Sequence, residues 1–310
     1  MIHDIIPDIH ADLSRLEQTL QALGYRHTTI AGETRWRPPA GQQAAFLGDF
    51  IDAGPQNREV LKIVRSLHDA GDAIAVMGNH ELNAILYHSP GVAWGAVQDG
   101  WMRAHTAKSR QQHGSFLAEY PADDDARRSV LAWFLSLPLA LDLGDFRIVH
   151  ACWSARALSL ISDRRPSLTL SDEDFQEVAL QETDFARAVA QTVKGPEIDL
   201  PPGAGFRDFH GTRRGQMRLC WWQNRGAQTY RSAALSVPDP MELPDCPIPA
   251  SEGVEFYPDM AVPVFFGHYK LQGDPGPVLS RPGNAVCLDW PDHAVSWRIG
   301  RGQSQGFRHD

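Results

Sequence analysis

The sequence is poor in cysteine, which argues against a fold held together by disulfide bonds. Its 310 residues include 4 cysteines, which are widely spaced and form no Cys-x-x-Cys pair. This spacing is more typical of reduced thiols than of a disulfide framework.

The sequence also lacks a hydrophobic run long enough to cross a membrane. Its longest charge-free apolar stretch, residues 129–141, is shorter than the roughly 18 to 20 residues that a membrane span needs. The first eight residues contain two acids and no basic segment that leads into an apolar one, so no signal peptide is visible. We therefore expect a cytoplasmic protein without a membrane partner.

An excess of positive charge is absent as well. The net charge of −9 argues against a general nucleic-acid binder, whose affinity depends on Lys and Arg side chains that neutralise phosphates. A local basic face remains compatible with this charge. With 43% apolar and 22% charged residues, the composition indicates a globular protein, either one large α/β domain or two average ones.

The chain does contain a regular alternation of strand and helix patterns. Residues 1–6 predict a strand, and four leucines at helical spacing between 13 and 23 predict a helix that ends at Gly24. Residues 44–47 predict a second strand, 60–67 a second helix, and 73–77 a third strand. Such alternation favours parallel βαβ units, in which ligands bind at the carboxyl ends of the strands.

Side chains able to bind a metal follow five apolar runs. They are Asp8 with His10, Asp49, Asn79 with His80, His150, and His268. Taken singly, each is more typical of a turn or of a hydrogen-bonded core histidine than of a ligand. Taken together at five strand ends, and with Asp8 and His10 two residues apart on one face, they indicate a shared metal centre.

The segments that carry these residues resemble, as an ordered set, the motifs of the calcineurin-like metallophosphoesterases. They are "DIH" at 8–10, "GDFIDAGP" at 48–55, "GNHE" at 78–81, "HAC" from 150 and "GHY" from 267. The resemblance is strongest to bacterial relatives of the phosphoprotein phosphatase branch. It implies an α/β fold, a four-layer sandwich of two β-sheets flanked by helices. We expect a single domain over 1–310, with 154–262 as an insertion or cap.

The resemblance also implies roles for the individual residues. Asp8, His10 and Asp49 would bind one divalent metal ion, and Asp49, Asn79, His150 and His268 would bind a second, so that Asp49 bridges the two. A metal-bridging hydroxide would then attack phosphorus. His80 would protonate the leaving oxygen and Asp52 would orient His80, although Asp52 could instead cap a helix that starts near Gln56. Ligands without a thiolate favour Mn²⁺, Fe²⁺ or Fe³⁺, and Zn²⁺.

One departure from the family pattern concerns the substrate phosphate. Ala53 stands where the phosphoprotein phosphatase branch usually has a phosphate-binding arginine. We expect Arg225 or Lys194 to replace it, with Arg58 and Arg103 as further candidates. Four arginines between 206 and 218 form either a substrate contact or an ordinary solvated surface.

The sequence leaves the substrate open between a phosphoprotein and a small phosphorylated metabolite such as a dinucleoside polyphosphate. A different class, a non-enzymatic metal-binding scaffold, is disfavoured because all six ligand positions and His80 are present. Near the carboxyl terminus, we expect a loop at 237–249, a closing hairpin at 285–300 and a frayed tail after it.

Overall fold

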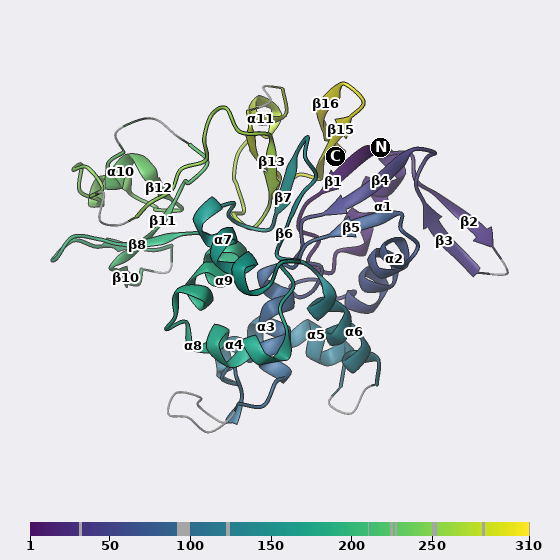
Figure 1. The fold of residues 1–310 in the computed structure, drawn as a ribbon, viewed down its shortest axis with the longest axis horizontal. Coiled ribbons are helices and arrows are strands. Elements are labelled where there is room, and N and C mark those ends of the chain that lie inside the picture. The colour runs from purple at the N-terminus through teal and green to yellow at the C-terminus, as the bar shows by residue number, and fades with distance from the viewer. Residues whose placement is uncertain are drawn as a thin grey trace.

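The computed structural model describes residues 1–30, 33–91, 100–121, 125–209, 211–223, 226, 228–249, 253–280 and 283–309. Two β-sheets lie at the centre of the described chain, and helices cover their outer faces (Figure 1). The expected α/β sandwich is therefore confirmed.

The larger of these two sheets contains the three strands that the alternating pattern predicted. Its order is β16 (Gln303–Arg308), β15 (Val295–Gly300), β1 (Ile2–Ile6), β4 (Gln42–Phe46) and β5 (Ala73–Ala75). Strands β1, β4 and β5 run parallel, whereas β15 and β16 are antiparallel to their neighbours. Their parallel course places the carboxyl ends of β1, β4 and β5 at one edge.

The second sheet supplies the two remaining strand ends of the expected site. Its order is β14 (Ala285–Cys287), β13 (Val264–Phe266), β7 (Arg147–Val149) and β6 (Ala140–Asp142). Strand β13 is parallel to both of its neighbours, so β7 and β13 end at the same edge.

Side chains that alternate along the strands form two separate layers of the core. Ile5, Phe265 and Trp297 belong to a cluster between the two sheets, whereas their neighbours Ile6 and Phe266 pack with the helices. Successive residues of a strand point to opposite faces, and both faces are apolar here. This pattern produces the layer order helices, sheet, sheet, helices.

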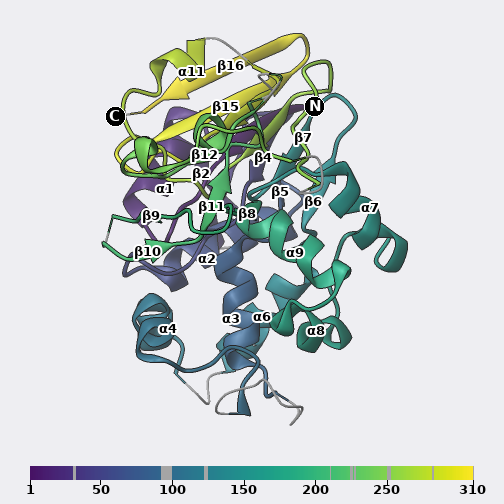
Figure 2. The same ribbon diagram turned by 90° about the vertical axis from the view of Figure 1, so that its left-hand side faces the viewer.

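Helices on the outer faces complete the two packed layers. The larger sheet is covered by α1 (Leu13–Ala22) and α2 (Asn57–Asp69), beside the protruding hairpin of β2 (Arg26–Ile30) and β3 (Glu33–Arg37). The remaining helices of this part are α3 (Asn79–His88), α4 (Ala107–Gln112), α5 (Gly114–Glu119), α6 (Asp125–Ser136), α7 (Ala155–Arg164), η2 (Asp172–Asp174), α8 (Phe175–Leu180) and α9 (Asp184–Lys194). Figure 2 shows α7, α8 and α9 grouped on one side of α3. Within the described residues, none of the helices combines the length and apolar character that a membrane crossing requires.

The chain between α9 and β13 forms a smaller unit with its own apolar cluster, which contains Ile198, Met217 and Tyr230. Its elements are β8 (Glu197–Asp199), β9 (Phe206–Arg207), β10 (Arg213–Arg214), β11 (Gln216–Leu219), α10 (Tyr230–Ala233), β12 (Ala234–Leu235) and η3 (Pro240–Glu242). Apart from η3, the described part of 237–249 is loop, as the sequence predicted.

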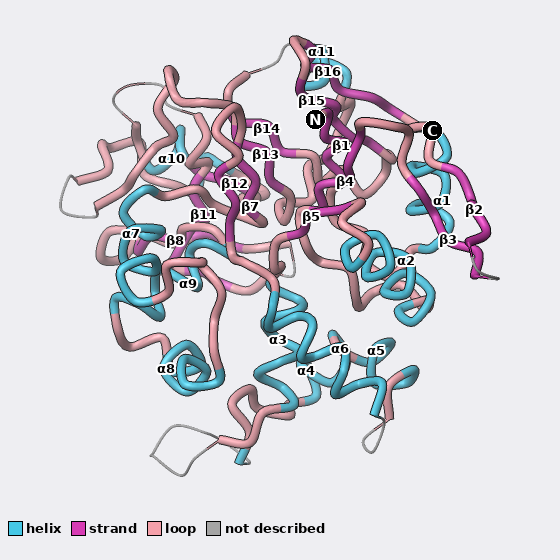
Figure 3. Tube along the Cα trace, turned by 45° about the vertical axis from the view of Figure 1, so that its right-hand side comes forward, coloured by secondary structure: helices cyan, strands magenta, loops and turns pink. Residues whose placement is uncertain are grey.

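The structure corrects two predictions near the carboxyl terminus (Figure 3). Residues 285–300 do not form a hairpin, because β14 pairs with β13 in one sheet while β15 pairs with β1 in the other. The tail is not frayed either, since β16 forms an antiparallel pair with β15 along its whole length. Helix α11 (Gly276–Ser280) packs beside β16.

Candidate active site

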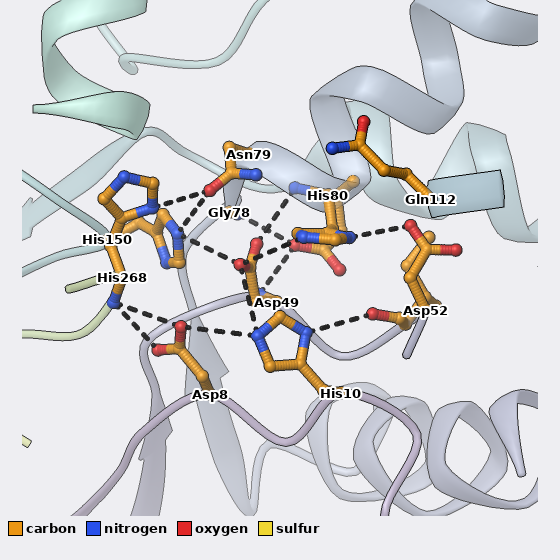
Figure 4. Close-up of polar contacts among 12 residues, drawn as sticks. Asp8, His10, Asp49, Asp52, Gly78, Asn79, His80, Gln112, His150 and His268 are labelled. Carbon is orange, nitrogen blue, oxygen red and sulfur yellow. Dashed lines mark hydrogen bonds and ion pairs between the residues drawn. The ribbon is translucent and has the colours of Figure 1, made fainter. Parts of the chain in front are cut away.

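The candidate ligands lie where the strand ends of the two sheets meet. Asp8 and His10 follow β1, Asp49 follows β4, Asn79 opens α3 after β5, His150 follows β7 and His268 follows β13. Figure 4 shows these side chains arranged around Asp49, which occupies the centre. The sequence therefore predicted the convergence of residues that are up to 260 positions apart.

One group of side chains surrounds the amide oxygen of Asn79. Its Oδ1 lies 2.7 Å from His268 Nδ1 and 3.1 Å from His150 Nε2. His150 Nε2 is also 3.4 Å from Asp49 Oδ2. The other ring nitrogen of His150, Nδ1, bonds the Leu47 carbonyl at 2.8 Å and fixes the ring orientation.

A second group lies on the opposite side of Asp49. His10 Nε2 is 3.9 Å from Asp8 Oδ2 and 3.9 Å from Asp49 Oδ2. These separations are too long for hydrogen bonds. They suit two ligands of one ion, because ligands bonded at about 2.1 Å lie at most about 4.2 Å apart.

Unmet polar groups indicate that these residues fit bound cations. Nε2 of His10, which faces Asp8 and Asp49, is buried and has no hydrogen-bond partner among the described residues. Burial, followed by the charge of nearby Asp289, raises the pKa of Asp8 well above its usual range. Burial also opposes ionisation of Asp49, but the rings of His150 and His80 outweigh it and hold the Asp49 pKa well below its usual range. A cation would stabilise the ionised form of Asp8 and would bind the carboxylate of Asp49, which is already charged.

The backbone of the site is held in a rarely populated conformation. His10, Asp49, Asp52 and His268 have φ angles of 51°, 51°, 69° and 74°, values in the left-handed region that L-residues seldom adopt. Strained backbone of this kind clusters at functional sites. A Cβ on Gly267 would lie only 1.8 Å from Asp8 Oδ1, so glycine is required beside that carboxylate.

Glu81 fixes the two turns that carry Asp49 and Asn79. Its fully buried carboxylate accepts hydrogen bonds from the backbone N–H groups of Asp49 at 2.8 Å, Phe50 at 2.8 Å and Gly78 at 3.0 Å. No role is predicted for Glu81 from the sequence. Its position three residues after Gly78, in a helix-capping pattern, was the available signal.

His80 and Asp52 form the expected pair. His80 Nδ1 lies 2.7 Å from Asp52 Oδ2, while His80 Nε2 is 3.9 Å from Asp49 Oδ2 and so faces the centre. Burial disfavours the charged His80 ring, but Asp49 and Asp52 outweigh it and raise the His80 pKa to about 9. Asp52 does not cap α2, because the residue before that helix is Gln56, without a side-chain cap bond.

A cavity of about 720 Å³ opens beside Asn79 and His268. Its wall includes Lys194 at the end of α9 and Arg218 on β11. Within the described ranges, Lys194 makes no hydrogen bond or ion pair, and burial lowers its pKa. Arg218 pairs loosely with Glu197, at 3.4 Å.

The other candidate phosphate ligands differ in position. Arg225 lies outside the described residues. Arg58 donates to the Glu119 carbonyl and stacks over Tyr120, and among the described residues it is not part of the cavity wall. Arg103 donates to Gln112 at 2.9 Å, and Gln112 lies near His80 and Asp52 in Figure 4.

Three of the four arginines between 206 and 218 make side-chain contacts with nearby residues of the same smaller unit. Arg207 donates to the carbonyl of Gly211, Arg213 to that of Gly203, and Arg214 to Asp208. Arg218 is the member of this cluster that lines the cavity.

Comparison with known proteins identifies the family. The model of the calcineurin-like phosphoesterases matches residues 4–177, more than half of the chain. The chain belongs to this family.

Similar proteins of known name support the same assignment. A symmetrical bis(5'-nucleosyl)-tetraphosphatase from Aromatoleum aromaticum is 31% identical over 36% of this chain and 34% of its own length. An asymmetrical one from Anoxybacillus flavithermus is 38% identical over 26% of this chain and 31% of its own. The matched part of the chain thus covers about a third of the length of these curated relatives.

A solved structure extends the likeness to the whole chain. The cold-active protein-tyrosine phosphatase of a Shewanella species superimposes with a TM-score of 0.51 over 100% of this chain and 78% of that chain, at 13% identity. At this identity the likeness shows a shared fold.

Proposed function

We propose that this chain is a phosphoesterase that uses two divalent cations. One observation carries the proposal: the Asp49 carboxylate lies within 3.9 Å of ring nitrogens from both groups, His10 on one side and His150 on the other. Both contacts are made by the same oxygen, Oδ2, and a charged carboxylate oxygen can bridge two cations, which lie about 3.5–4 Å apart in two-metal sites.

The family resemblance implies how the residues divide between the two cations. Asp8, His10 and Asp49 would hold one, and Asp49, Asn79, His150 and His268 the other. When bound, such cations activate a water molecule as a nucleophile and stabilise charge on the phosphoryl oxygens. The donor set of carboxylate, amide oxygen and imidazole suits Mn²⁺, iron or Zn²⁺.

His80 would supply the proton that the leaving oxygen needs. Its Nδ1–H donates to Asp52, which leaves Nε2 facing the centre as the atom that carries the transferable proton. Asp52 stabilises the charged ring before the transfer and keeps it oriented.

The cavity supplies the substrate phosphate with positive charge that position 53 lacks. Ala53 is exposed and has no charge, whereas Lys194 lies on the cavity wall with Asn79 and His268. We assign the phosphate contact to Lys194, with Arg225 as the second candidate. In this assignment the region 154–262 acts as the substrate-facing cap, because α9 and β11 come from it.

Two substrate classes suit this arrangement. The relatives named as bis(5'-nucleosyl)-tetraphosphatases favour a phosphate anhydride of the dinucleoside polyphosphate type, and a cavity of about 720 Å³ has room for groups beyond the phosphate. A phosphoprotein is the second candidate, and its support is the position of the cavity beside the candidate centre. The cytoplasmic location and the choice of manganese stay predictions.

The decisive experiment replaces the bridging carboxylate. Asp49→Asn should abolish p-nitrophenyl phosphate hydrolysis and lower the bound metal, because an amide oxygen lacks the negative charge needed to bridge two cations. The exposed Asp274, which pairs with Arg308, provides a control: Asp274→Asn should keep both properties. Elemental analysis and turnover with Mn²⁺, Fe²⁺, Zn²⁺ and Mg²⁺ measure the outcome. Metal binding without turnover on a broad phosphate-ester and anhydride panel would instead favour the scaffold.

A further inference from the structure

The carboxylate of Asp52 has a second histidine partner. His80 bonds one oxygen, Oδ2, at 2.7 Å, and His113 Nδ1 bonds the other, Oδ1, at 2.8 Å. Asp52 is almost fully buried and His113 fully so, and their hydrogen bond therefore lies away from bulk solvent. His113 comes from the turn between α4 and α5, which is remote in sequence from the strand-end motifs.

The His113 ring is enclosed on several sides. It stacks on Phe116, with ring centroids 4.7 Å apart and an interplanar angle of 17°, and lies 5.1 Å from the Tyr87 ring. Its Nε2 is 3.3 Å from Nε2 of His88, at the end of α3. This packing leaves the ring little freedom to turn away from Asp52.

The directions of these hydrogen bonds follow from their chemistry. An ionised carboxylate only accepts, so His113 and His80 must both donate from Nδ1. In a neutral His113 ring, Nε2 is then an acceptor for the Nε2–H of His88. Burial lowers the His88 pKa to about 3, which keeps His88 neutral and gives it a single ring proton. The chain from His88 through His113 to Asp52 is therefore fully paired.

Asp52 also needs external orientation. Its backbone N–H donates to Asn57 at 2.9 Å, which anchors the main chain but not the rotation of the carboxylate. With Oδ1 bonded to His113, the carboxylate plane is fixed, and Oδ2 stays directed at His80.

We propose that His113 is a positioning residue for the phosphoester reaction: it clamps Asp52 so that His80 holds its proton on the atom that faces the leaving group. The inference rests on the proposed function, because it assigns His80 the role of acid. It adds a support, the fully buried His113 with its neighbour His88, that the strand-end motifs do not contain.

Three substitutions test the clamp. His113→Leu removes the donor, while His113→Asn places an amide N–H at the δ position and can keep the bond to Asp52. His105→Asn is the matched control, since His105 stacks on Tyr87 in the same segment but does not contact Asp52.

With an alkyl phosphate, whose leaving oxygen needs a proton, His113→Leu should lower kcat by about 10- to 100-fold, the worth of a hydrogen bond to a charged group. With p-nitrophenyl phosphate the loss should be several-fold smaller. His113→Asn should recover most of the rate, and His105→Asn should stay within about twofold of wild type. An equal loss on both substrates, or no rescue by Asn, overturns the clamp and leaves His113 a core residue.

A second measurement does not depend on turnover or on the folding of a variant. Long-range ¹H–¹⁵N spectra of the full wild-type chain should show both His80 and His113 protonated at Nδ1, with those protons shifted downfield by the carboxylate. An Nε2–H tautomer of neutral His113 overturns the inference. If the wild type shows the expected tautomers but hydrolyses no phosphate ester, the proposed function fails while the structural clamp stands.

Discussion

Glu81 offers a stability test of how the site is assembled. The substitution Glu81→Gln keeps the size of the side chain but converts one carboxylate oxygen to an NH₂ group. Glu81 accepts three N–H bonds, from Asp49, Phe50 and Gly78. In the glutamine variant, the NH₂ group must therefore lie opposite at least one of these N–H donors, which then has no acceptor. The least costly orientation places NH₂ opposite Phe50, whose N–H is the single partner of Oε1.

The magnitude follows from these three bonds. Burial raises the Glu81 pKa to about 7, so the comparison is made above that pH, where the carboxylate is charged. One buried N–H without an acceptor costs about 1–3 kcal/mol, and two bonds that change from a charged to a neutral acceptor lose about 1 kcal/mol each. Burial of a neutral amide in place of a charge offsets part of this loss. We therefore expect the free energy of unfolding to fall by about 2–4 kcal/mol.

Glu119 provides a matched control. Its carboxylate also accepts three N–H bonds, from Asn57 N and Nδ2 and from Arg58 N, but it lies at a partly exposed position where water can replace a lost acceptor. Glu119→Gln should cost at least about 1 kcal/mol less than Glu81→Gln. Urea unfolding of both variants, in chelator so that metal binding does not contribute, measures the difference. Equal losses would refute the conclusion that buried Glu81 holds the two turns together.

Three further predictions concern the reaction. His80→Gln should keep the metal content and slow hydrolysis by about 10²- to 10⁴-fold, less with good leaving groups; loss of metal would make His80 a ligand instead. Lys194→Ala should leave the metal content unchanged and lower kcat/KM by a factor that corresponds to about 1–3 kcal/mol of lost transition-state stabilisation. Arg58→Ala, which removes a side chain directed at Glu119 and Tyr120, should leave kcat/KM within about twofold of wild type. Removal of metal by a chelator should lower the thermal midpoint of the wild type more than that of Asp49→Asn, and equal shifts would argue against a cation at Asp49.

The strand ends of the site were predictable because each candidate ligand directly follows an apolar run. Asp49 after β4 and His150 after β7 lie in different sheets, and the motif order, rather than the periodicity, indicated that both sheets share one edge. The structure confirmed the predicted fold class, and the family model confirmed the predicted family. His113 carried no comparable signal, because it lies between two short helices and its contact with Asp52 is 61 residues away in the sequence.

The errors near the carboxyl terminus have a common physical cause. The apolar runs of β14 and β15 are close in sequence and separated by Pro291 and Asp292, which is also what a hairpin looks like. A hairpin would have left the antiparallel edge of β1 open, whereas β15 pairs there and inserts Trp297 between the two sheets. Once β15 occupies that edge, it exposes a new one, and β16 covers it although most of its residues are polar. Backbone hydrogen bonds along β15, together with the single apolar side chain of Phe307, therefore order the tail, and a hydrophobicity pattern does not reveal such a strand.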